Sequence, residues 1–187
     1  MTTESYTANY QSALSYLKLN LKDPAKETLK RALAQVSQDD MREDNPIYLG
    51  IISTLAFLSL EQADFQGACR YVDQGLSVKK SHLDLLFLKA LLLMDQKRYD
   101  EMLETIIHYL LAKGNGDEAV YEYRYAHEGA LREIYENLLP TSYRLAFQQV
   151  EIKDLVRKLS EAARSEWLKK ALEVMVKMDG QRNQQEH

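Results

Sequence analysis

Glycine, proline and cysteine are scarce in this sequence, with seven, three and one residues among 187. Sheet-rich folds place glycine and proline at many tight turns, so the scarcity of both favours a mostly helical protein. The single cysteine, Cys69, excludes an intramolecular disulfide and a metal site built from several cysteines. We expect Cys69 to be a small hydrophobic residue on the inward face of a helix.

An excess of positive charge is also missing, because the formal net charge is −4 at pH 7. Residues 1–152 hold 16 Lys or Arg against 22 Asp or Glu, whereas residues 153–182 hold eight against five. A weakly basic stretch of this kind is typical of a solvated helix face. We therefore expect the protein to bind neither nucleic acid nor an anionic membrane.

No long hydrophobic run is present. The longest, residues 85–94, contains Lys89 and is shorter than the roughly 20 apolar residues that span a bilayer. The first residues, MTTESYTANYQ, lack the basic start and the apolar core of a signal peptide. These absences predict a cytoplasmic protein.

Motifs that carry catalysis are absent as well. His127 and Glu128 begin the pattern of a zinc-protease helix, but Leu131 stands where the second histidine belongs. The glycine-containing segment 114–116 lacks the lysine and the Ser or Thr of a phosphate-binding loop. We expect no enzyme activity, no catalytic residue, no metal site and no cofactor.

What the sequence does contain is a period of 34 residues. Bulky and small residues keep this spacing in four pairs: Phe65 and Tyr99, Ala68 and Met102, Val72 and Ile106, Gly75 and Tyr109. Residues 47–61 and 83–95, which come before these pairs, repeat apolar residues at helical steps. Each unit is therefore predicted to be two helices joined by a tight turn, at residues 62–64 and 96–98. Helix pairs of this size bury their apolar faces by stacking on one another.

These units resemble the tetratricopeptide repeat (TPR) family, which has the same period. The first unit matches the family's slots best, with Leu55, Ala56, Phe65, Ala68, Val72 and Gly75. The second unit departs from them at Lys89, Met102 and Tyr109. An earlier unit fits from residue 6, with Ala13 in the small slot, and the linker 38–46 then holds nine extra residues.

The strict period fails after residue 111. A break at 112–117 is followed by a predicted long helix, 117–139, which Pro140 is expected to end, with a new helix starting at Thr141 or Ser142. The remaining chain reads as helix with a break near Ser165. Its expected apolar stripes are Leu155, Leu159, Ala162 and Ala163, and then Trp167, Leu168, Ala171, Leu172 and Met175.

The sequence thus predicts an all-α protein, a TPR-like right-handed solenoid of three to four helix pairs with a C-terminal capping helix. It forms one domain over residues 1–180, followed by a flexible tail at 181–187. The boundaries we expect are repeats at about 6–37, 49–80 and 83–111, and divergent helices at 117–178.

The resemblance implies a function in protein binding. In this family the first helices of successive repeats line a concave groove that holds a partner peptide or helix. The groove positions here are Tyr10, Leu14, Leu17, Ser53, Phe57, Leu60, Phe87, Leu91 and Met94. This apolar, aromatic and Met-containing set suits another protein's hydrophobic segment or amphipathic helix. We expect an adaptor, an assembly factor or a small chaperone.

One version of the family grips a C-terminal carboxylate with cationic and amide side chains. The corresponding positions here are Tyr10, Leu14, Thr54, Asp84 and Leu88, from which no cationic clamp can be built. Binding of such a carboxylate is therefore disfavoured.

Two alternatives stay open at this point. A self-associating scaffold would fill the groove with its own helices or with a second copy of the chain, and a peptide-sensing regulator would need an attached effector domain. A secondary aromatic surface at Tyr121, Arg124 and Tyr125 is predicted to be a helix interface. Five acidic residues between positions 117 and 133 oppose a phosphate backbone, and so the stacking of nucleic-acid bases there.

Overall fold

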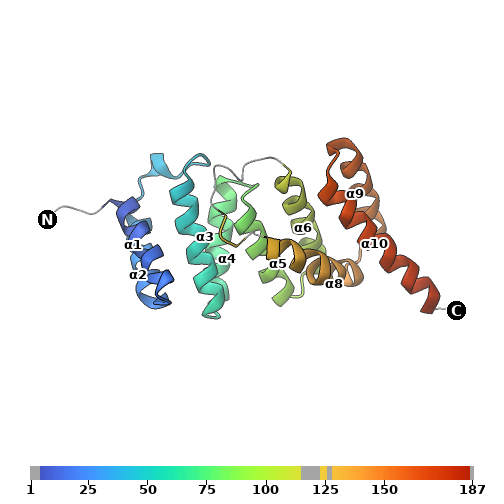
Figure 1. Cartoon of the computed structure of the whole chain (residues 1–187), viewed down its shortest axis with the longest axis horizontal. Coiled ribbons are helices and arrows are strands. Elements are labelled where there is room, and N and C mark those ends of the chain that lie inside the picture. Colours follow the sequence, from blue (N-terminus) through green and yellow to red (C-terminus); the bar gives the residue numbers. More distant parts are fainter. Residues whose placement is uncertain (1–4, 115–122, 126–127, 186–187) are drawn as a thin grey trace. The chain divides into compact units, whose positions relative to one another are not determined.

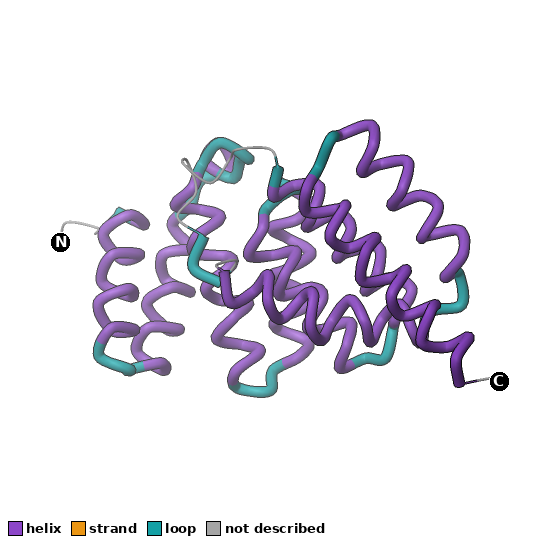
Figure 2. Tube along the Cα trace, turned by 45° about the vertical axis from the view of Figure 1, so that its right-hand side comes forward, coloured by secondary structure: helices purple, strands orange, loops and turns teal. Residues whose placement is uncertain are grey.

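The computed structural model describes residues 5–114, 123–125 and 128–185, and within these ranges all regular secondary structure is helical (Figure 2). The all-α class predicted from the sequence is therefore confirmed. The chain divides into two compact units, Met1–Leu85 (unit 1) and Leu86–His187 (unit 2).

Unit 1 consists of two helix pairs and the beginning of a third (Figure 1). Helix α1 (Tyr6–Lys18) packs against α2 (Lys22–Gln35), and α3 (Pro46–Glu61) packs against α4 (Phe65–Val78). Helix α3 also contacts α2 and α1. The loop between the pairs contains a short 3₁₀ turn, Gln38–Asp40, which confirms the predicted linker.

Polar residues set where the helices of unit 1 begin. Asn45 precedes α3, and its Oδ1 accepts hydrogen bonds from the N–H groups of Ile47 and Tyr48, both at 3.1 Å. Asp64 precedes α4, and its Oδ1 accepts one from Gly67 at 2.9 Å. Each carboxylate or amide oxygen satisfies backbone donors that the first helical turn leaves unpaired.

Unit 2 contains the rest of α5 (Leu83–Asp95), paired with α6 (Tyr99–Lys113). It continues with α7 (Glu128–Glu133), α8 (Leu139–Leu145), α9 (Gln149–Ala163) and α10 (Glu166–Gln185). Helices α9 and α10 form another pair, and both contact α6. Helix α10 also contacts α8.

The predicted helix 117–139 is wrong in two respects. Residues 123–125 are not helical, and Pro140 does not end a helix but lies in the first turn of α8. A π-helical turn, Ile134–Leu138, joins α7 to α8 without a break (Figure 2). Proline lacks an N–H donor and clashes with the carbonyl four residues earlier, so a wider turn before it lets the helix continue.

The same backbone turn joins the two helices of every sequential pair. Asn20, Ala63, Lys97 and Arg164 each adopt the left-handed conformation, with φ between 49° and 57°. At Ala63, the N–H donates to the carbonyl of Leu60 (3.0 Å), and the next N–H, that of Asp64, donates to Ser59 (2.8 Å). The other three turns repeat this pattern, that of a Schellman motif. Ala63 and Lys97 lie 34 positions apart, so the sequence period marks these turns.

Replacing Ala63 with glycine is expected to raise the free energy of unfolding by about 0.5–1 kcal/mol. A left-handed backbone strains residues with a Cβ atom and does not strain glycine. Urea denaturation of the Ala63→Gly variant measures the change. Exposed Ala162 on α9 is the matched control, because Ala162→Gly in a helical backbone should instead cost about 1 kcal/mol. If Ala63→Gly and Ala162→Gly both destabilise the protein, the backbone of Ala63 is not strained.

Small side chains occupy the predicted slots in the first helices. Ala13, Ala56 and Ala90 are 0–2% exposed, which confirms that α1, α3 and α5 present a small residue to their neighbours. The stripe predicted for α9 has the wrong phase, because Leu155 is 47% exposed whereas Ile152 and Val156 are buried. On α10, Leu168, Ala171 and Met175 are fully buried as predicted, with Trp167 and Leu172 half-buried.

Candidate functional site

The candidate groove residues of unit 1 lie on α1 and α3, two helices in contact. Leu17, Phe57 and Leu60 are half-buried and keep part of their apolar surface accessible. The other three predicted positions are buried: Tyr10 and Leu14 are 8% exposed and Ser53 is 2% exposed. The accessible three are called the unit 1 apolar surface below.

Tyr10 is buried because it packs on Gly50. A Cβ atom on Gly50 would lie 2.3 Å from the Tyr10 hydroxyl oxygen, so only glycine permits this approach of α1 to α3. Ser53 is buried beside it, and its hydroxyl donates a hydrogen bond to the Gly50 carbonyl at 3.3 Å. Tyr10 therefore packs α1 against α3, and the Ser53 hydroxyl is satisfied within α3 itself.

In unit 2 the candidate positions lie on α5. Phe87 and Leu91 are half-buried, and Met94 is 36% exposed. The ring of Phe87 packs on Tyr109 of α6, with 6.5 Å between ring centroids and a tilt of 54°. Phe87, Leu91 and Met94 are called the unit 2 apolar surface below.

The five positions that correspond to a carboxylate clamp are all buried. They are Tyr10, Leu14, Thr54, Asp84 and Leu88, and their exposed fractions lie between 0% and 8%. None of them presents a group to a bound carboxylate.

The structure describes two of the three residues of the secondary aromatic surface. Tyr121 lies outside them, Arg124 is exposed and Tyr125 is half-buried. Because residues 123–125 are not helical, the helical spacing that grouped these side chains does not apply to Arg124 and Tyr125.

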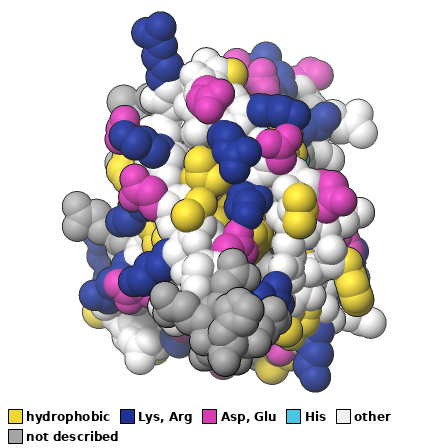
Figure 3. All heavy atoms as spheres, turned by 90° about the vertical axis from the view of Figure 1, so that its right-hand side faces the viewer, with side chains coloured by type: hydrophobic (Ala, Val, Ile, Leu, Met, Phe, Trp, Pro, Cys, Tyr) yellow, Lys and Arg dark blue, Asp and Glu magenta, His cyan; other side chains and the backbone are white. Residues whose placement is uncertain are grey.

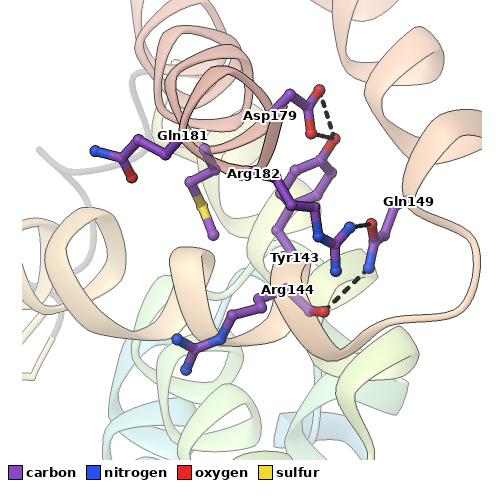
Figure 4. Close-up of a pocket in the computed structure, with 7 residues that line it drawn as sticks. Tyr143, Arg144, Gln149, Asp179, Gln181 and Arg182 are labelled. Atoms are coloured by element: carbon purple, nitrogen blue, oxygen red, sulfur yellow. Dashed lines mark hydrogen bonds between the residues drawn. The ribbon is translucent and has the colours of Figure 1, made fainter. Parts of the chain in front are cut away.

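A polar cluster in unit 2 was not anticipated from the sequence. Tyr143 of α8 donates its hydroxyl to both carboxylate oxygens of Asp179 on α10, at 3.0 and 3.2 Å (Figure 4). Lys153 of α9 forms an ion pair with the same carboxylate. Burial, together with the hydrogen bond to Asp179, raises the pKa of Tyr143 well above its ordinary value. The cluster ties α8, α9 and α10 together, and its groups satisfy one another.

A cavity of about 290 Å³ opens beside this cluster. Arg182 points toward Gln149 and donates to its Oε1 at 2.8 Å, and Gln149 in turn donates to the backbone carbonyl of Arg144 at 3.0 Å (Figure 4). The Arg144 guanidinium points away from Gln149 (Figure 4). The cavity thus has a cationic and hydrogen-bonding lining, but its polar groups mainly fix the backbone between α8 and α9.

Sequence reasoning missed the cluster because its members are far apart in the chain. Tyr143 and Asp179 are separated by 36 positions, and Lys153 and Asp179 by 26. No local motif links a tyrosine, a lysine and an aspartate at such spacing. A similar contact nearby joins the Tyr135 hydroxyl to the Trp167 carbonyl at 2.8 Å, and burial raises the pKa of Tyr135.

His82 and Cys69, the other described candidates for a chemical role, pack within or beside helices of unit 1. His82 is 3% exposed and precedes α5, where its Nδ1 accepts a hydrogen bond from the Leu85 N–H at 3.4 Å. Cys69 is half-buried on α4. Within the described ranges, no three His, Cys, Asp or Glu side chains are placed to hold a metal ion. In the same part of the chain, no helix has the length and hydrophobicity needed to cross a bilayer.

Comparison with known proteins gives no relative. No model of a protein family, no curated protein and no solved structure matches the chain.

Proposed function

We propose that the chain is a TPR-like helical-repeat protein that binds other proteins without catalysing a reaction. Its pairs would form a right-handed solenoid in which α10, the second helix of the last pair, covers the end of the stack. The repeated left-handed turn at Asn20, Ala63, Lys97 and Arg164 supports this assignment, as do the buried small residues of the first helices. Stacked pairs that share one turn and one small slot are typical of helical repeats.

One observation carries the binding function. Equivalent positions on the first helices hold large apolar side chains that stay partly accessible, namely Phe57 and Leu91, and likewise Leu17, Leu60 and Met94. Other apolar residues of the same helices are buried, among them Leu55 and Leu92. Apolar side chains that recur at one position on successive helices suit the hydrophobic face of an amphipathic helix or an extended segment.

The chemistry of the two apolar surfaces narrows the partner. The six side chains of these surfaces bring aromatic, aliphatic and thioether groups but no cation, and the clamp positions are buried. The bound segment is therefore recognised by its apolar side chains and not by a terminal carboxylate. An adaptor, an assembly factor or a small chaperone that covers such a segment fits this surface.

The competing function is that of a self-associating scaffold, whose groove is filled by its own helices or by a second copy of the chain. Met94 keeps 36% of its surface exposed, and Phe57 and Leu91 are only half-buried. These values favour surfaces that stay open in the single chain over surfaces covered by the chain's own helices.

The double variant Phe57→Glu with Leu91→Glu is expected to reduce partner capture about tenfold or more. A carboxylate in each apolar surface must be desolvated when a hydrophobic segment binds. The wild-type protein and the double variant are each used as bait in native lysate, and the proteins that each bait retains are quantified by mass spectrometry. Circular dichroism checks that the variant is folded.

The matched control carries Leu155→Glu and Val176→Glu, which alter exposed apolar residues of α9 and α10 (47% and 53% exposed). It should retain the partner at the wild-type level. Equal retention by all three baits would refute the proposed surfaces. Retention of nothing but the same chain, lost in the Phe57→Glu, Leu91→Glu variant, would instead favour the self-associating scaffold.

A further inference from the structure

The turn between α8 and α9 exposes an apolar tip. Phe147 is 95% exposed, Val150 is 71% exposed and Leu145 is 44% exposed. These three residues are called the α8–α9 tip below. An aromatic side chain such as Phe147 buries about 150–250 Å² when covered. Large contiguous apolar patches on soluble proteins usually mark an interaction site.

The backbone under the tip is held in place. The N–H groups of Phe147 and Gln148 both donate to Asp100 Oδ1 on α6, at 2.9 and 3.3 Å. Gln149 donates to the carbonyls of Arg144 and Ala146, at 3.0 and 2.9 Å. Phe147 is therefore presented outward by a fixed turn, so little conformational entropy is lost when it is covered.

Charges of both signs flank the tip. Arg144 in the last turn of α8 and Glu151 in the first turn of α9 are exposed, and in the described part of the chain neither forms an ion pair. Arg182 is a further cation near the turn, but its guanidinium is directed to Gln149 (Figure 4). The surface thus combines an apolar centre with one available cation and one available anion.

We propose that the α8–α9 tip binds the same surface of a second copy of this chain. In a two-fold contact each copy supplies the same patch, so Phe147 packs against the partner's apolar tip. The two-fold symmetry also allows two equivalent ion pairs, each between Arg144 of one copy and Glu151 of the other. A surface whose charges complement themselves suits its own copy, and this contact does not involve the apolar surfaces of the proposed function.

An anionic membrane fits these observations less well. Glu151 lies directly beside Val150, and the chain has a net charge of −4. The face that contains α9 and α10 shows hydrophobic side chains scattered among lysines, arginines and acids (Figure 3). A membrane-binding surface would instead gather cations around its apolar residues.

Sedimentation velocity over a series of protein concentrations tests the proposal. We expect a monomer–dimer equilibrium with a Kd on the order of 10–100 µM, because three side chains per copy form a small contact. Phe147→Ser should raise this Kd about tenfold or more, and circular dichroism should show an unchanged fold, since the Phe147 side chain is almost wholly exposed. Arg144→Glu should weaken the dimer, and Arg144→Glu combined with Glu151→Arg should restore it.

Three results would overturn the proposal. They are a monomer at every concentration, a dimer that Phe147→Ser leaves intact, and a double charge variant as weak as Arg144→Glu alone. A dimer lost in the Phe57→Glu, Leu91→Glu variant and kept in Phe147→Ser would place self-association in the groove. Flotation of a monomeric wild type with phosphatidylserine vesicles, and not with phosphatidylcholine vesicles, would assign the tip to a lipid surface.

Discussion

Lowering the pH from 7 to 5 is expected to reduce the free energy of unfolding by about 2 kcal/mol through His82 alone. Burial, and secondarily the charge of Lys79, lowers the pKa of His82 from 6.5 to about 3. Between these two values the unfolded chain binds a proton at this histidine and the folded chain does not. The contribution of His82 to the free energy of unfolding is therefore present above pH 6.5 and is lost progressively as the pH falls toward 3.

The His82→Asn variant should lose this part of the pH dependence. Asparagine keeps an oxygen acceptor before α5 for the Leu85 N–H and carries no titrating group in this range. Urea denaturation of both proteins at several pH values measures the difference, which also removes the contribution of carboxylates common to both. His108→Asn on exposed His108 is the control and should follow the wild type. A His82→Asn variant as acid-sensitive as the wild type would show that His82 is protonated in the folded state.

Replacing Gly75 with alanine is expected to destabilise the protein by about 1–3 kcal/mol. A Cβ atom there would lie 2.3 Å from Leu85 Cδ1 and 2.9 Å from Ile52 Cγ2, so α4 would have to move away from α3 and from the start of α5. This cost exceeds the gain of about 0.5–1 kcal/mol that alanine brings to a helix interior. Thermal or urea unfolding measures the net change.

Gly180 on α10 provides the opposite case. A Cβ atom there has no neighbour within 4 Å, so Gly180→Ala should stabilise the protein by about 0.5–1 kcal/mol.

A double variant tests the clash at Gly75. The effects of Gly75→Ala and Leu85→Ala on the free energy of unfolding should be strongly non-additive, because the smaller side chain at position 85 relieves the clash. Additive effects would mean that Gly75 does not set the spacing of these helices.

Local signals explain how much of the fold was predictable. The helices of the first three pairs start and end within a few residues of their predicted limits, because apolar periodicity and the 34-residue spacing fix them. The turns at Ala63 and Lys97 lie where the sequence placed them. The break near Ser165 is also confirmed, as Arg164 carries the left-handed turn before α10.

A local backbone adjustment and tertiary packing explain what was missed. Pro140 is a sound stop signal in isolation, but a π-helical turn, Ile134–Leu138, lets the helix continue into α8. Periodicity also gave the wrong face of α9, because Leu155 and Val156 are adjacent and packing alone selects Val156. Of the nine predicted groove residues, Tyr10, Leu14 and Ser53 are buried. The contact of Tyr10 with Gly50 corresponds to no sequence motif, so the sequence did not indicate that Tyr10 is buried.

The shared left-handed turn has a consequence for how the chain changes length. Between Ala63 and Lys97 the spacing is 34 residues, but between Asn20 and Ala63 it is 43, and the extra residues lie in the linker around the 3₁₀ turn Gln38–Asp40. Within a pair, an insertion would displace the hydrogen-bonded turn, whereas the linker between α2 and α3 accommodates nine residues more than the 34-residue spacing requires. This linker is therefore the best place to insert a reporter peptide. We also expect homologous sequences to differ in length at this linker more than within a helix pair.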